Sequence, residues 1–138
     1  MNKIFLSHSS HDKQYVEYIA TKLGKDIAIY DKFSFESGLK TFDEILKELD
    51  VTDLFVIFLS NSAWESEWVK KELNISNELK QKEKLKQIYP IIIDSSLSYS
   101  DPRIPKWLNN NGFNSYNLRY ISSPKLAYRK IKNQLIFL

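Results

Sequence analysis

The chain has 138 residues, of which 43% are hydrophobic and 27% are charged, as is typical of a single globular domain rather than a disordered or fibrous protein. Its net charge of +3 is too small for a dedicated nucleic-acid-binding protein, and the absence of cysteine excludes disulfides and thiolate chemistry. The two histidines, His8 and His11, have no third ligand at a metal-binding spacing, so no metal site is expected.

Short apolar runs alternate along the chain with longer segments whose apolar residues recur at helical spacing. The expected strands cover 3–6, 27–30, 54–59, 88–93 and, more weakly, 113–118. The expected helices cover 12–23, a segment from about 41, 63–80, a short helix around 106–108, and 124–135. This alternation predicts an α/β fold with a five-stranded parallel sheet and helices on both faces. Ligands of such sheets bind at the carboxyl ends of the strands.

Local signals refine these elements. Pro90 lies within the fourth apolar run and lacks a backbone N–H, which predicts a place near an edge or a bulge. Two helix starts resemble capping boxes, one formed by Thr41 with Glu44 and the other by Ser62 with Glu65.

A carboxylate interrupts the apolar face of the 63–80 helix. Glu72 follows Trp68 by one turn, on the side where the apolar residues gather. One interpretation is that Glu72 lies at the edge of the apolar face and reaches water or a lysine. The other is a cleft in which the tryptophan supplies a flat wall and the glutamate a positioned negative charge.

Several other chemistries lack their residues. The three glycines, Gly24, Gly38 and Gly112, are scattered and form no phosphate-binding loop. A phospho-acceptor receiver needs acidic residues at the ends of the first and third strands, which here are followed by Ser7 and Ser60. The nucleophile elbow of a serine hydrolase is also missing.

Three segments together carry a family resemblance. They read K-I-F-L-S-H-S-S-H-D-K, then Y-D-K-F-S-F-E-S-G, then F-V-I-F-L-S-N-S-A-W-E-S-E-W-V-K-K-E-L. In order and separation they resemble the three boxes of a TIR domain, over Lys3 to about Ile93. The resemblance implies a flavodoxin-like three-layer sandwich, with residues 1–138 as one TIR domain. The abrupt apolar end L-I-F-L leaves open that the chain is the N-terminal part of a longer protein.

TIR domains either act as scaffolds or cleave the nicotinamide glycosidic bond of NAD+. In the cleaving members the catalytic residue is the glutamate of a W-x-x-x-E pattern, which Trp68 and Glu72 match. The resemblance implies the following substrate-binding residues: His8, Asp31, Glu36, Gly38 and Trp68.

Three of these binding positions also have an ordinary structural interpretation. His8 suits a strand-end histidine bonded to the backbone, Asp31 a strand-terminating cap, and Gly38 a turn that needs a positive φ. Lys40 departs from the family pattern, because an aromatic residue is often found two positions after the loop glycine.

The resemblance therefore implies a cytoplasmic NAD+ glycohydrolase or cyclase. It would release nicotinamide and form ADP-ribose or cyclic ADP-ribose, as an effector of bacterial antiviral defence that self-assembly with other TIR domains activates. NAD+ is then the substrate, with no separate cofactor and with neither nucleic acid nor a membrane as partner. The alternative is a non-catalytic adaptor that acts through TIR–TIR contacts.

Overall fold

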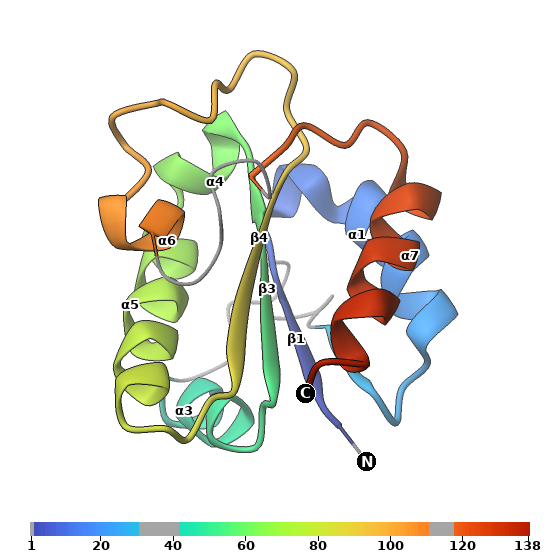
Figure 1. The fold of residues 1–138 in the computed structure, drawn as a ribbon, viewed down its shortest axis with the longest axis vertical. Coiled ribbons are helices and arrows are strands. Elements are labelled where there is room, and N and C mark those ends of the chain that lie inside the picture. Colours follow the sequence, from blue (N-terminus) through green and yellow to red (C-terminus); the bar gives the residue numbers. More distant parts are fainter. Residues whose placement is uncertain (1, 31–41, 111–117) are drawn as a thin grey trace.

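The computed structural model describes residues 2–30, 42–110 and 118–138. These residues form a three-layer α/β sandwich with the sheet in the middle (Figure 1). The strands are β1 (Ile4–Ser7), β2 (Ala28–Ile29), β3 (Leu54–Leu59) and β4 (Gln87–Ile92). All neighbouring strands are parallel, in the order β2-β1-β3-β4. The predicted parallel α/β fold is therefore confirmed.

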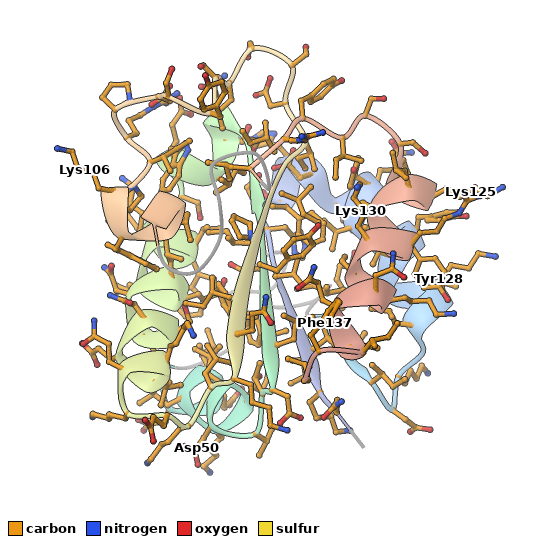
Figure 2. The ribbon with its side chains drawn as sticks, in the orientation of Figure 1. Asp50, Lys106, Lys125, Tyr128, Lys130 and Phe137 are labelled. Carbon is orange, nitrogen blue, oxygen red and sulfur yellow. The ribbon has the colours of Figure 1, made fainter. Side chains whose placement is uncertain are left out.

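Helices cover both faces of this sheet, as predicted. One face carries η1 (Ser10–Asp12), α1 (Lys13–Leu23) and α7 (Pro124–Leu135). The other carries α3 (Phe42–Asp50), α4 (Asn61–Glu65), α5 (Glu67–Gln81) and α6 (Lys106–Asn110). Figure 2 shows Lys106 of α6 and Lys125 of α7 pointing outward on opposite sides of the molecule.

Strand β3 forms the centre of the core. It is flanked by β1 and β4, and every one of its six side chains is fully buried. Phe55 lies in register with Phe5 on one side and Ile88 on the other. An uninterrupted apolar run is what a strand covered on both faces requires, and this prediction is confirmed.

The described residues form four strands rather than the five expected. Most of the expected fifth strand, 113–118, lies outside the described residues. Just after it, an isolated parallel bridge joins Ile92 to Tyr120. There the Ile92 N–H donates to the Arg119 carbonyl at 3.2 Å, and the Ile121 N–H donates to the Ile92 carbonyl at 2.8 Å. The segment around Tyr120 thus runs beside β4, but within the described residues it pairs with β4 through this one bridge.

Pro90 lies within β4 without disturbing the ladder. Along a strand, the backbone N–H and C=O groups of successive residues point to alternate sides. Those of Ile92 point away from β3, toward the segment that contains Arg119. Pro90 precedes Ile92 by two residues and faces the same side, so no N–H is missing from the ladder with β3. The predicted place of this proline near a sheet edge agrees with that geometry.

The predicted 63–80 helix is in fact two helices. The chain is extended at Ser66 (φ −86°, ψ 113°), which ends α4 and begins α5. The N-caps are Ser60 and Ser66, whose hydroxyls accept backbone N–H groups at 3.0 and 3.2 Å. The predicted cap at Ser62 with Glu65 is therefore wrong, because serines on either side of it start the helices instead.

Other helix ends agree with the sequence. Gly24 ends α1 at a φ of 89°, a conformation that favours glycine, and its N–H donates to the Ala20 carbonyl at 2.9 Å. Thr41 lies outside the described residues, so its capping box with Glu44 stays a prediction. Within the described ranges, no helix is both long and apolar enough to cross a bilayer.

Candidate functional site

Glu72 is buried at the carboxyl end of β1. Only 5% of the residue is exposed, and its Oε1 accepts a hydrogen bond of 2.7 Å from the hydroxyl of Ser7. Ser7 is the last residue of β1 and is itself buried. This burial excludes the interpretation in which Glu72 reaches bulk water from the edge of its helix. The carboxylate instead lies where ligands of parallel sheets bind.

The break at Ser66 sets which residues of α5 face inward. The buried side chains of α5 are Val69, Glu72, Leu73 and Ser76. An ionised carboxylate in such surroundings costs several kcal/mol unless hydrogen bonds or charges compensate it. The Ser7 hydroxyl supplies part of this compensation and fixes one carboxylate oxygen in place.

His8, the residue after Ser7, is also buried. Its Nδ1 lies 2.9 Å from the Leu6 carbonyl oxygen. A carbonyl can only accept, so Nδ1 carries the proton and Nε2 of the neutral ring is an acceptor. The imidazole stacks on Tyr30, with ring centroids 5.2 Å apart and planes inclined by 20°. Burial lowers the pKa of His8, against the smaller opposing effects of the Leu6 hydrogen bond and the Asp12 charge.

The structure places some of the predicted site residues and leaves others undescribed. Trp68 is half-buried on α5, one turn before Glu72, and packs against the core. Asp31, Glu36 and Gly38 lie outside the described residues. Among the described residues, Glu72 therefore lies at the carboxyl end of β1, and His8 directly follows that strand.

Sequence reasoning missed the role of serines at this edge. Ser7 holds Glu72, while Ser9 and Ser60 both donate to Oδ2 of Asp12, at 2.9 and 2.5 Å. Asp12 thereby ties the segment after β1 to the segment after β3. The signal was present in the sequence, because a hydroxyl directly follows each of two apolar runs. In the sequence, these two serines were evidence only against a phospho-acceptor receiver, which needs acidic residues at the same positions.

A polar hollow of about 290 Å³ opens between η1 and the start of α4 and α5. Its lining residues are Ser9, Ser10, His11, Ser62, Glu65 and Ser66. Glu72 does not line it. Across the described ranges, no three His, Asp or Glu side chains are grouped so as to hold a metal ion. The hollow suits a ligand rich in hydroxyl groups or other hydrogen-bonding groups.

A family model described as TIR domain matches residues 4–131. The chain belongs to the TIR domain family. The resemblance to a TIR domain, inferred from three segments of the sequence, is thereby confirmed.

The fold also occurs in solved structures. This TIR domain is similar to the TIR domains of the activated Roq1 resistosome, which directly recognises the pathogen effector XopQ. The TM-score is 0.60 at 20% sequence identity, over 72% of this chain. The chain spans 61% of the length of that Roq1 chain, and the likeness shows the fold. No curated protein matches the sequence.

The buried His8 makes the stability of the TIR domain depend on pH. Its pKa is lower in the folded state than the ordinary 6.5, so below about pH 6.5 the unfolded chain binds more protons. We expect stability to fall between about pH 7.5 and pH 5.5, by at most about 1.4 kcal/mol per pH unit from this group. Urea unfolding at both pH values measures the loss, which should be smaller in His8→Gln.

The exposed His11 provides the control for that measurement. His11→Gln removes the other imidazole of the chain from an exposed position, so its comparison with His8→Gln isolates the effect of burial. An equal loss of stability in His8→Gln and in the parent would show that other groups carry the effect.

The Ser7 hydroxyl should stabilise the fold through Glu72. We expect Ser7→Ala to lower the free energy of unfolding by about 1–3 kcal/mol, because it removes a donor from a buried carboxylate. In a Glu72→Gln background the same substitution should cost about half as much, since a neutral amide forms the weaker bond. Urea unfolding of the four proteins gives the coupling. If Ser7→Ala lowers the free energy of unfolding equally in the parent and in Glu72→Gln, the Ser7–Glu72 hydrogen bond does not stabilise the fold.

Proposed function

We propose that this TIR domain cleaves the bond between nicotinamide and ribose in NAD+, with Glu72 as the catalytic residue. The product would be ADP-ribose or cyclic ADP-ribose. The observation that carries the proposal is the buried carboxylate of Glu72, which the Ser7 hydroxyl holds at the carboxyl end of β1. A carboxylate kept there despite the cost of burial needs a purpose, and positive charge developing on a substrate supplies one.

One carboxylate suffices for this reaction. Ordinary glycosidases need two, because an alkoxide leaves poorly without a proton from a general acid. Nicotinamide departs from a pyridinium as a neutral molecule and needs no proton. Glu72 then has one task, which is to stabilise the oxocarbenium charge on the ribose or to act as a transient nucleophile.

The surroundings of Glu72 suit a cationic ring. Since burial lowers the pKa of His8, the imidazole is neutral near pH 7 and does not repel a pyridinium. Trp68 offers an aromatic surface one turn from Glu72. The residues proposed to bind substrate are His8, Asp31, Glu36, Gly38 and Trp68. NAD+ is the substrate in this proposal, and no further cofactor takes part.

Self-assembly forms part of the proposal. The similar Roq1 TIR domains belong to an activated resistosome, which supports activation of this domain by contact with other TIR domains. We place it in the cytoplasm as an effector of defence. In the alternative, a TIR adaptor without catalysis, the buried Glu72 serves the fold by accepting the Ser7 hydroxyl.

The test is the release of nicotinamide from NAD+. The protein is incubated with NAD+ when dilute, when concentrated and with a crowding agent, and the products are separated by chromatography. We expect nicotinamide to form fastest in the concentrated and crowded samples. The absence of nicotinamide under all three conditions would contradict the proposal, and the same chromatogram distinguishes linear from cyclic ADP-ribose.

A further inference from the structure

The charged side chains of this TIR domain are distributed unevenly along the chain. Of its 20 basic and 17 acidic side chains, residues 118–138 hold five of the basic ones and none of the acidic ones. Residues 42–110 hold nine basic and twelve acidic side chains, so their net charge is −3. The helices of these two segments cover opposite faces of the sheet (Figure 1). One side of the molecule is therefore positive relative to the other.

Helix α7 and the residues that follow it present a cationic and partly apolar surface. The exposed side chains of this segment recur at spacings of three and four residues, as on one side of a helix. They include Lys125, Leu126, Arg129, Lys132, Ile136 and Phe137, which we name the α7 face. Within the described ranges, none of the ion pairs involves a cation of this face. Its positive charge is therefore available to a partner.

Helix α3 presents a surface of the opposite charge. Four of its nine residues are acidic and one is basic, which gives the helix a net charge of −3. Its exposed side chains include Asp43, Leu46 and Asp50, and the exposed Val51 directly follows the helix. We name these four residues the α3 face. Apolar side chains thus adjoin carboxylates on α3, as they adjoin cations on the α7 face.

The lysine nearest to this surface does not neutralise it. Lys84 lies 4.0 Å from the carboxylate of Asp50, and both side chains are more than half exposed. Counted together with α3, Lys84 still leaves a net charge of −2. An exposed ion pair of this kind contributes little to stability. A cation of a partner can therefore replace Lys84 beside Asp50.

Both helices carry charge at the end where their own dipole disfavours it. The backbone dipole makes the start of a helix positive and its end negative. The first turn of α7 contains Lys125 and no acidic residue. The last turn of α3 contains Glu48 and Asp50. Contact between the two helices would offset the unfavourable charge of each.

We infer that the α7 face of one copy of this chain binds the α3 face of a second copy. The cations of α7 lie against the carboxylates of α3, and the exposed apolar side chains of the two faces cover one another. The inference rests on the self-assembly in the proposed function, for which it names the surfaces.

This contact is head-to-tail. Because α3 and α7 lie on opposite sides of the sheet (Figure 1), each copy can use both faces at once, and the contact repeats in an open series. A symmetric pair of two α7 faces would instead bring like charges together.

Sedimentation velocity at rising protein concentration, without NAD+, tests the contact. We expect the parent to associate in about 0.05 M NaCl with a dissociation constant on the order of 0.1 mM, as for a weak interface. In about 0.5 M NaCl the association should be at least about fivefold weaker, because salt screens charges at exposed surfaces.

Complementary charge reversals locate the two faces. One variant combines Arg129→Glu with Lys132→Glu, and the other combines Asp43→Lys with Asp50→Lys. Neither variant alone should associate, because its two faces then have the same sign. An equal mixture should associate within about threefold of the parent, since each face of one variant is opposite in charge to the face that it meets on the other. Recovery in the mixture also shows that both variants are folded.

Lys71→Glu combined with Lys106→Glu is the matched control. It reverses two exposed cations outside both faces and should associate within about twofold of the parent. A parent that stays monomeric at about 0.5 mM protein and low salt would overturn the inference. So would a mixture that does not associate, or a control that loses association as the face variants do. Nicotinamide release is measured separately, so failure of this contact is distinguished from failure of NAD+ cleavage.

Discussion

Glu72→Gln is expected to lower the rate of nicotinamide release by at least about 10²–10³-fold, while the protein stays folded. Removing one preorganised electrostatic contact to a developing charge typically costs this much. The glutamine keeps the shape of the side chain, and its amide oxygen can still accept the Ser7 hydroxyl that lies 2.7 Å from Oε1. The measurement is the initial rate of nicotinamide formation at saturating NAD+, with near-ultraviolet circular dichroism to verify the fold.

Glu78→Gln provides the matched control. Glu78 lies on the same helix but is exposed, so its substitution removes an equal charge far from the strand ends. We expect its rate to stay within about twofold of the parent. If Glu72→Gln cleaves NAD+ as fast as Glu78→Gln, the catalytic role of Glu72 is wrong, whatever the activity of the parent.

The order of the elements could be predicted from the sequence because burial imposes it. The run 54–59 has no polar residue, which only a strand covered on both faces tolerates. The division of the 63–80 helix could not be predicted in the same way. Three serines, Ser60, Ser62 and Ser66, are each capable of capping a helix, and packing against the sheet decides which of them do so.

For the candidate site, the sequence could predict which residues take part but not which of them contact one another. Helical spacing placed Glu72 among apolar side chains, but it could not show that Ser7, which is 65 residues earlier, donates to it. That contact depends on the packing of α5 against β1, the strand that Ser7 ends. The state of His8 is likewise a tertiary effect, since Tyr30 comes beside it only when β2 pairs with β1.

The largest effect on stability is expected at the centre of the sheet. Phe55→Ala should lower the free energy of unfolding by about 3–5 kcal/mol, the usual cost of a large cavity in a core. Phe55 is fully buried, and its ring stacks on that of Phe5 with centroids 5.5 Å apart and planes inclined by 18°. Its neighbours in β1 and β4 are held by backbone pairing, so they cannot close the space. A loss of this size is a large part of the stability of a small domain.

Phe137→Ala removes the same side chain where nothing covers it. Phe137 is 77% exposed, so its substitution should change stability by less than about 0.5 kcal/mol. Urea unfolding followed by circular dichroism compares both variants with the parent. A loss below about 1 kcal/mol for Phe55→Ala would show that β3 is not the rigid centre on which Ser7 and Glu72 are positioned. The account of the catalytic carboxylate would then lose its structural support.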